Sequence, residues 1–413
     1  MRMPKSEVLQ NIYGESDVSG ARYENLAAHF TELFGERDAE FFTAPGRTEI
    51  VGNHTDHNGG KIFAGSINMD TIGAAAMNEK NVITIVSEGY ERPIVVDLSD
   101  LSHAPKEQGS VSLVAGMAEA MTKMGYHVGG FDAYVSTEVI PSAGVSSSAS
   151  FEMLVCAMLN YFYNDGQITY AEYARIGQYA ENHFWNKASG LMDQMACAAG
   201  GAILLDFSDG VKCEKRSFSF GDYGYELVIV NTGKGHADLS AEYSAIPGEM
   251  KAVARELGVD LLCQSNLEAL MEKLPQIREK LGNDRAILRA LHFYTENKRV
   301  EEMDAAVAAG DKEKILAVLT ASGNSSWKWL QNCHVETAHE EQSICLALAM
   351  TELFLNKIGD GACRIHGGGF AGVIMAVVPK EKTAEYKKYI GALVGEENVY
   401  VMNLRQTGAV HVA

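Results

Sequence analysis

A run of small residues at 140–149 reads Ile-Pro-Ser-Ala-Gly-Val-Ser-Ser-Ser-Ala and joins two segments of different character. Residues 131–139 before it alternate like a half-buried strand, and the apolar stretch 151–159 after it is typical of a buried helix. A loop with so few bulky side chains at a helix start leaves backbone N–H groups and the helix dipole free to bind an anion. The run therefore predicts a phosphate-binding loop, with a tight turn carrying serine caps as the alternative.

Two further segments combine glycines with polar side chains. Residues 366–372 read His-Gly-Gly-Gly-Phe-Ala-Gly and precede the strand-like stretch 373–378, and residues 44–60 place polar side chains between glycines. The sequence contains neither Gly-x-x-x-x-Gly-Lys-Ser/Thr nor a Gly-x-Gly-x-x-Gly that opens a βαβ unit. It therefore indicates neither a P-loop ATPase nor a dinucleotide-binding enzyme.

The length and charge of the chain limit the classes of protein that it can belong to. Its 413 residues favour two domains over one. The net charge of -19 argues against a nucleic-acid partner, and it requires any bound phosphate to be held by local N–H groups, a few cations and Mg²⁺. The seven cysteines have no Cys-x-x-Cys spacing, which predicts a reduced, cytoplasmic setting. No apolar run reaches about 18 residues, and the polar N-terminus lacks a signal-peptide pattern, so we expect neither secretion nor a membrane partner.

The order of the secondary-structure patterns indicates an α+β protein, because strands come first, helices follow and strands return at the end. We place the domain boundary near residues 206–211, which gives domains 1–208 and 209–413. The expected strands are residues 82–86, 94–98, 131–139, 202–207, 225–230, 373–378 and 399–404. The expected helices are residues 150–163, 170–185, 267–281, 286–293, 344–355 and 383–393.

Several single residues are candidates for chemistry, and each has an ordinary alternative. Asp193 follows Gly190 and two apolar residues, where a carboxylate could face a cleft or simply cap the next helix. Glu181 is either an Mg²⁺ ligand or a solvated helix charge. Arg47 follows Pro-Gly and could bind a phosphate or a carboxylate with two hydrogen bonds, or form a surface ion pair.

The residues His54, Asp56 and His57 resemble part of a metallohydrolase ligand cluster. That interpretation lacks a further paired His upstream, and we favour hydrogen-bonding roles or a structured turn.

The three segments resemble, in family order, the three motifs of the GHMP small-molecule kinases, and the flanking sequence is most similar to the galactokinases. The resemblance runs from Ala44-Pro45-Gly46-Arg47 through Met192-Asp193-Gln194 to Gly367-Gly368-Gly369-Phe370. It implies the two-domain α+β GHMP kinase fold, with a mixed-sheet N-terminal domain, a helix-rich α/β C-terminal domain and the active site between them.

The resemblance also implies a role for each motif in phosphoryl transfer. Asp193 would be the catalytic aspartate, which takes the proton of the sugar's anomeric hydroxyl or orients it, while Arg47 stabilises the transferred phosphoryl group and keeps Asp193 ionised. Mg²⁺ would be bound by Ser147 or Ser148 together with Glu181. The residues implied to bind ATP are Ala143, Gly144, Val145, Ser146, Ser147, Ser148, Ala149, Gly368 and Gly369.

For the sugar, the resemblance implies binding by Asn53, His54, Asp56, Gly190 and Tyr243. The sequence departs from the family pattern at four places: Asn53 replaces Glu, His57 replaces Tyr, Ser142 replaces Gly, and Thr48-Glu49 replaces Val-Asn. The missing Glu would accept a hydrogen bond from the hydroxymethyl end of galactose, whereas Asn carries no charge to repel a C6 carboxylate.

The expected function is therefore a galactokinase that makes galactose 1-phosphate from galactose and ATP. Asn53 and His57 motivate an alternative, a 1-kinase for another hexose or for a uronic acid such as galacturonate. A kinase-like sugar sensor without catalysis is an alternative of another class, although the serine run is complete. The expected partners are a small sugar and ATP, and the sequence leaves the oligomeric state open and is compatible with a monomer.

Overall fold

The computed structural model describes residues 1–413 except 142, 187–188, 234–238 and 371. In this part of the chain a mixed sheet of eight strands has the order β12-β1-β2-β5-β3-β4, with β6 paired to β2 and β7 paired to β6. The β3–β5 pair is parallel and the other pairs are antiparallel. Its strands are β1 (Glu40–Val51), β2 (Lys61–Met77), β3 (Val82–Ser87), β4 (Ile94–Asp97), β5 (Phe131–Thr137), β6 (Ala202–Asp206), β7 (Lys212–Arg216) and β12 (Val410–His411).

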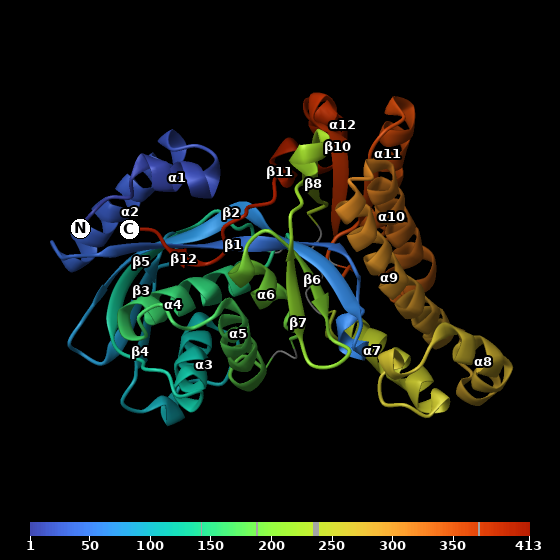
Figure 1. Ribbon diagram of the computed structural model, residues 1–413, viewed down its shortest axis with the longest axis horizontal. Coiled ribbons are helices and arrows are strands. Elements are labelled where there is room, and N and C mark those ends of the chain that lie inside the picture. The colour runs from blue at the N-terminus through green and yellow to red at the C-terminus, as the bar shows by residue number, and fades with distance from the viewer. Residues whose placement is uncertain (142, 187–188, 234–238, 371) are drawn as a thin grey trace.

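Helices cover both faces of this sheet. Side chains alternate between the two faces along each strand, so apolar residues next to each other in the sequence can pack against different helical layers. Phe41 packs with the first two helices on one face, and its neighbour Phe42 packs with later helices on the other face. Figure 1 shows these layers, with both termini at the same end of the molecule. The first layer contains α1 (Ser6–Tyr13) and α2 (Asp17–Phe34), and the second contains α3 (Ser110–Lys123), α4 (Ser147–Tyr163), α5 (Tyr170–His183) and α6 (Met192–Ala199).

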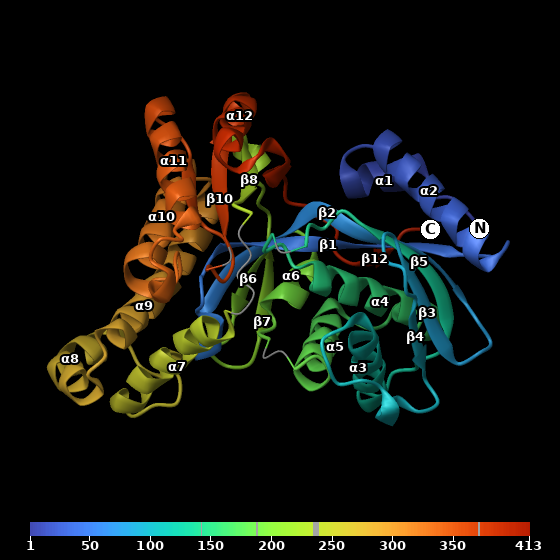
Figure 2. The same ribbon diagram turned by 180° about the vertical axis from the view of Figure 1, so that it is seen from behind.

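The second half of the chain builds a smaller antiparallel sheet in the order β11-β8-β10-β9 (Figure 2). Alternate residues of its central strands pack against α9 and α10 on one face and against α11 and α12 on the other. The strands are β8 (Tyr225–Asn231), β9 (Ala362–Ile365), β10 (Val373–Pro379) and β11 (Val399–Met402). The helices of this half are α7 (Ser240–Leu257), α8 (Leu267–Leu281), α9 (Asp284–Ala309), α10 (Lys312–Ser325), α11 (Ser343–Ile358) and α12 (Thr383–Val394).

The expected strands and helices all have counterparts in the structure, and most of their ends differ by at most three residues. The exception is the helix expected at residues 286–293, which is only the first part of α9, since that helix continues to Ala309. Residues 44–51, expected only as a polar glycine-rich segment, instead form the buried outer half of β1. The proposed division at 208/209 stays a prediction; β7 and β12, which follow that boundary in sequence, pair with strands of the first sheet.

The serine loop meets β1 because the backbones approach closely at Gly46. A Cβ at this position would lie 2.7 Å from the carbonyl oxygen of Val145, so only glycine lets the serine loop rest on β1. The Arg47 N–H donates to the same carbonyl at 3.1 Å. The register of β1 against β2 also shifts between Pro45 and Arg47, a bulge of the kind that redirects side chains beside functional sites.

Candidate active site

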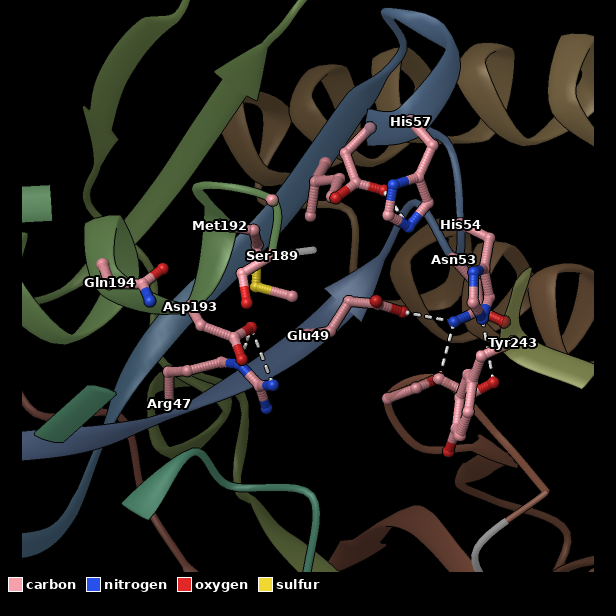
Figure 3. Close-up of a pocket in the computed structure, with 15 residues that line it drawn as sticks. Arg47, Glu49, Asn53, His54, His57, Ser189, Met192, Asp193, Gln194 and Tyr243 are labelled. Carbon is pink, nitrogen blue, oxygen red and sulfur yellow. Dashed lines mark hydrogen bonds and ion pairs between the residues drawn. The ribbon is translucent and has the colours of Figure 1, made fainter. Parts of the chain in front are cut away.

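The side chain of Asp193 contacts a guanidinium and a hydroxyl that come from two other segments. Figure 3 shows the first of these contacts, between Asp193 and Arg47. Arg47 directs Nε and Nη2 to Asp193 Oδ1, each at 2.8 Å. Ser146 Oγ donates to Asp193 Oδ2 at 2.6 Å. The structure thus brings together the two predicted catalytic residues and one residue of the predicted ATP loop.

The local backbone explains these positions. Asp193 lies in the first turn of α6, where the helix dipole favours a negative charge. Ser146 precedes α4 in the left-handed conformation, with φ 58° and ψ 61°, which directs its hydroxyl away from the helix. Arg47 Nη1 also donates to the carbonyl of Gly144. Burial lowers the pKa of Arg47, but the charge and hydrogen bond of Asp193 and the neighbouring acidic groups together outweigh this effect and raise it.

The N-terminus of α4 presents backbone N–H groups and serine hydroxyls at the surface of the serine loop. Ser147 and Ser148 are partly exposed, whereas Ala143, Val145 and Ala149 are buried and anchor the loop. Phosphate binding by the described part of the loop stays a prediction. Ser142, the predicted departure in this loop, lies outside the described residues.

Ser148 and Glu181 form the one oxygen pair near the loop that the sequence assigned to a metal. Ser148 Oγ donates to Glu181 Oε1 at 3.4 Å, and the Glu181 side chain is buried at the loop's edge. A hydroxyl and a carboxylate suit Mg²⁺, which takes few protein oxygens and completes its shell with phosphates and water. Elsewhere, the described residues contain no group of three or more His, Cys, Asp or Glu able to hold a metal. His54, Asp56 and His57 therefore do not form such a group.

A cavity of about 240 Å³ opens beside Asp193 and collects all five predicted sugar-binding residues. Its walls come from β1 and the turn after it, from β2, the 189–194 segment and α7, and from the glycine run. The described residues that line it are Arg47, Glu49, Asn53, His54, Asp56, His57, Ile62, Ser189, Gly190, Met192, Asp193, Gln194, Tyr243, Gly367 and Gly368.

Two aromatic residues of this cavity are held by the glycine run. His54 Nε2 lies 2.8 Å from the carbonyl of Gly368, and Tyr243 Oη donates to the carbonyl of Gly369 at 2.7 Å. Burial and the nearby His57 lower the pKa of His54 to about 3, so its ring is neutral near pH 7. Burial raises the pKa of Tyr243 to about 12, which keeps the phenol protonated.

The glycine run therefore supports the wall of the 240 Å³ cavity through two of its carbonyls. Gly367 lies near the serine loop, since a Cβ there would be 3.9 Å from the carbonyl oxygen of Gly144. A Cβ at Gly368 would lie 2.6 Å from Tyr243 Cε1, so a larger residue would displace the ring. ATP binding by Gly368 and Gly369 stays a prediction.

Asp56 and Gly190 approach each other across the opposite wall. A Cβ at Gly190 would lie 2.5 Å from Asp56 Oδ2, and His57 Nε2 lies 3.6 Å from Asp56 Oδ1. Asp56, His57 and Gly190 also border a second, more open cavity of about 640 Å³. The residue at position 57 is therefore at the junction of both spaces.

Glu49 is a cavity residue that sequence reasoning named only as a departure from the family pattern. It lies two residues after Arg47 on β1, so the alternation of a strand places both side chains on the same face. The sequence did not mark residues 44–51 as a strand, because β1 is buried along most of its length and shows no alternation, so this shared face was not predicted. Asn53, by contrast, is fully buried and makes its contacts with protein groups.

A separate, mostly apolar cavity of about 510 Å³ reaches the start of α4, and sequence reasoning did not locate it. Ser147 and Ser148 border it on one side, and Phe151 and Trp185 contribute aromatic surface. Tyr90 and other residues from the loop between β3 and β4 complete the wall. Because these residues come from distant segments, no local pattern marked them.

Comparisons with known proteins agree with this geometry. The family model described as the galactokinase galactose-binding signature matches residues 28–77, and the GHMP kinases N terminal domain matches residues 112–201. A galactokinase of Lactococcus lactis subsp. lactis (strain IL1403) is 30% identical over 378 residues, which cover 90% of this chain and 91% of that protein.

Solved structures give the same result. The crystal structure of Lactococcus lactis galactokinase complexed with galactose superposes with a TM-score of 0.82 at 26% identity, covering 94% of this chain and 99% of that one. The Methanococcus jannaschii mevalonate kinase shares the fold, with a TM-score of 0.62 at 16% identity over 90% of this chain and all of that one (100%). Fold and site together define a GHMP kinase, which confirms the expected two-domain α+β architecture. Within that class, the chain belongs to the galactokinase family.

One further property concerns membranes. Across the described residues, none of the helices combines the length and apolar character needed to cross a bilayer.

Proposed function

We propose that this protein is an ATP-dependent galactokinase that transfers the γ-phosphoryl group of ATP to the anomeric hydroxyl of galactose. The observation that carries the proposal is the position of Asp193, which contacts Arg47 and the serine loop and also lines the 240 Å³ cavity. Phosphoryl transfer depends on positioning and charge stabilisation more than on covalent catalysis, and this arrangement supplies both.

In the proposed reaction, the anomeric hydroxyl donates a hydrogen bond to Asp193. As the sugar oxygen bonds to phosphorus, its proton passes to Asp193 and the bond between phosphorus and the ADP oxygen breaks. Arg47 stabilises the charge that develops on the transferred group. Backbone N–H groups at the start of α4 bind the phosphates, and the glycine run at Gly368 and Gly369 closes the other side.

Ser148 and Glu181 would hold Mg²⁺, which neutralises phosphate charge when it is bound. The apolar cavity that borders Ser147 would take the adenine and ribose, with Trp185 and Tyr90 offering surfaces on which a base can stack. Sugar and nucleotide then approach Asp193 from different sides. In this proposal, domain 1–208 supplies Arg47 and Asp193, and domain 209–413 supplies Tyr243.

The charges of the sugar cavity favour galactose over galacturonate. Glu49, Asp56 and Asp193 all line it. Among the described lining residues Arg47 is the one Lys or Arg, and Asp193 already neutralises it. A C6 carboxylate would therefore enter without a cationic partner, which is costly in a partly desolvated site. Comparing kcat/KM for galactose and galacturonate tests this choice, and a preference for the acid of about tenfold, roughly 1.4 kcal/mol, would reverse it.

Activity also decides between an enzyme and a sugar sensor. We expect galactose-dependent release of ADP from Mg-ATP that stops in Asp193→Ala, with ATP binding retained. Wild-type protein that binds galactose and ATP without releasing ADP would favour the sensor.

A further inference from the structure

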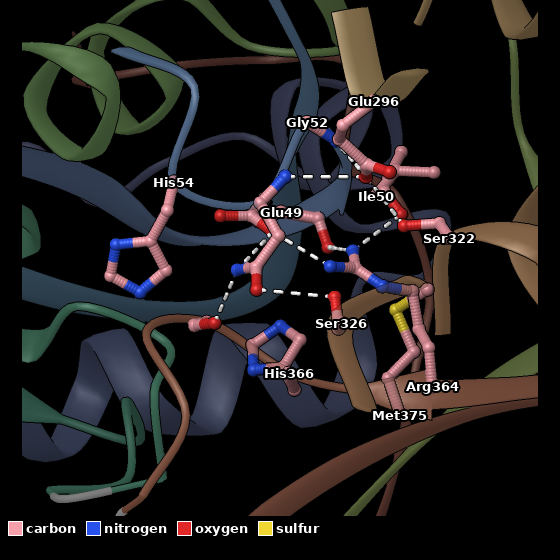
Figure 4. Close-up of polar contacts among 12 residues, drawn as sticks. Glu49, Ile50, Gly52, His54, Glu296, Ser322, Ser326, Arg364, His366 and Met375 are labelled. Atoms are coloured by element: carbon pink, nitrogen blue, oxygen red, sulfur yellow. Dashed lines mark hydrogen bonds and ion pairs between the residues drawn. The ribbon is translucent and has the colours of Figure 1, made fainter. Parts of the chain in front are cut away.

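Glu49 has a carboxylate whose two oxygens are in different environments (Figure 4). Its side chain is 5% exposed. Oε1 accepts from Arg364 Nη2 and from Asn53 Nδ2, both at 3.0 Å. Oε2 has no hydrogen-bond partner among the residues that the structure describes, although Glu49 lines the sugar cavity. The structure therefore leaves one oxygen of this carboxylate able to accept a hydrogen bond from a ligand in the cavity.

Asn53, four residues further on, cannot donate a hydrogen bond to Glu49 Oε2 without losing its own contacts. Its amide nitrogen donates to Glu49 Oε1 and to the carbonyl of Gly367 at 2.6 Å, which uses both N–H groups. Its oxygen accepts from Asn332 at 2.8 Å and from Ser326 at 3.3 Å. Asn53 therefore positions Glu49 and offers the sugar no free polar group.

The second half of the chain fixes the carboxylate in place. Arg364 on β9 is fully buried and donates to Glu49 Oε1 and, through Nη1, to the carbonyl of Ile50 at 2.7 Å. Glu296 on α9 accepts from the backbone N–H groups of Gly52 and Asn53 at 3.0 and 3.3 Å. The end of β1, which carries Glu49, and the turn after it, which carries Asn53, are thus held by Arg364 and Glu296, which pre-organises Oε2 toward the cavity.

We infer that Glu49, through Oε2, is the hydroxyl acceptor that sets the sugar specificity of this kinase, which restricts the site to neutral hexoses. The inference rests on the proposed function and deepens it. The hydroxyl in question is one other than the hydroxyl that receives the phosphoryl group, because Asp193 faces that one. Burial raises the pKa of Glu49, and the charge and hydrogen bond of Arg364 oppose this effect.

The test combines one variant with a series of sugars. Glu49→Gln keeps an oxygen for Arg364 and Asn53 but replaces Oε2 with an N–H₂ donor. The matched control is Glu40→Gln, the same change at the far end of β1, where Glu40 contacts His411 at 2.6 Å. Both proteins and the wild type are assayed with galactose and with its monodeoxy analogues.

We expect wild-type kcat/KM to fall about 10- to 100-fold for one monodeoxy sugar, and Glu49→Gln to lose a similar factor for galactose itself. Glu49→Gln should lose no further activity with that same analogue, because the lost hydroxyl and the lost acceptor are partners. KM for ATP should change less than about threefold, and Glu40→Gln should behave as wild type. Retention of galactose activity within threefold in Glu49→Gln would overturn the inference.

Two further comparisons test the inference even if the variant does not fold or the wild type is inactive. If Glu49→Gln does not fold, the wild-type series alone decides, since a monodeoxy series with no loss above threefold would contradict the inference. If the wild type phosphorylates no sugar, the proposed function fails by itself, and calorimetric binding of galactose and the same analogues to both proteins still tests Glu49. Equal sugar affinity of the wild type and Glu49→Gln would then overturn the inference.

Discussion

Arg47 and Asp193 are 146 positions apart in the sequence, yet Arg47 Nε and Nη2 both contact one carboxylate oxygen at 2.8 Å. The two-point contact fixes the orientation of the aspartate, and Arg47 Nη1 ties the pair to Gly144 of the serine loop. Asp193, Arg47 and the serine loop therefore form one hydrogen-bonded unit.

This unit predicts the effect of changing the arginine. Arg47→Ala should lower kcat at least about 100-fold, roughly 3 kcal/mol, because the developing phosphoryl charge loses its cation and Asp193 loses its orientation. Arg47→Lys keeps the charge but cannot make three directed contacts, so its loss should be intermediate. Steady-state kinetics with galactose and ATP give both values. A loss within threefold in Arg47→Ala would contradict the role.

The Ser146 hydroxyl contributes to the same unit, and its backbone allows a matched pair of variants. Both Ser146→Gly and Ser146→Ala remove the 2.6 Å contact with Asp193, and both should lower kcat about 5- to 30-fold, roughly 1–2 kcal/mol. Only alanine pays for the left-handed backbone, so Ser146→Gly should be the more stable variant by about 1 kcal/mol in urea unfolding. A glycine variant with wild-type kcat would show that the hydroxyl is dispensable.

Gly190 should act on sugar binding alone. Gly190→Ala places a methyl group 2.5 Å from Asp56 Oδ2, so Asp56 must move. We expect KM for galactose to rise about tenfold or more while KM for ATP stays unchanged. Gly248→Ala on α7 is the control, because a Cβ there meets no atom within 4 Å. Equal changes in both KM values would place Asp56 outside the sugar site.

The ionised side chain of Glu296 should make the free energy of unfolding depend on pH. Burial alone raises the pKa of Glu296, but His292 and Arg299 outweigh it and lower the pKa to about 2. A carboxyl group whose pKa is lowered by folding stabilises the folded protein at pH values above its ordinary pKa of 4.5. This contribution of about 3 kcal/mol is lost as the pH falls toward 2. Urea unfolding at pH 7, 5, 4 and 3 should therefore show the gap between the wild type and Glu296→Gln narrowing below pH 5.

The control for that experiment is an exposed acid. Glu385→Gln on α12 removes only a surface contact with Lys382, so its stability difference from the wild type should vary much less with pH. A constant gap between the wild type and Glu296→Gln from pH 7 to 3 would show that Glu296 does not carry this charge in the folded protein.

Local features of the site were predictable from the sequence, and long-range ones were not. The start of α4 follows from small residues before an apolar run, and the structure begins this helix at Ser147. β1 is buried along most of its length, so it lacks the alternation that marks a half-exposed strand. The role of Glu49 depends on Arg364, 315 positions away, and no spacing rule reports such a contact.

The position of the phosphorus in the product tests the central claim most directly, because the account places the anomeric hydroxyl of the sugar against Asp193. We predict that galactose and Mg-ATP give a product whose phosphorus couples to the anomeric proton in NMR spectra. Phosphorus coupled to the C6 protons, or ATP consumed without any sugar phosphate, would contradict the account.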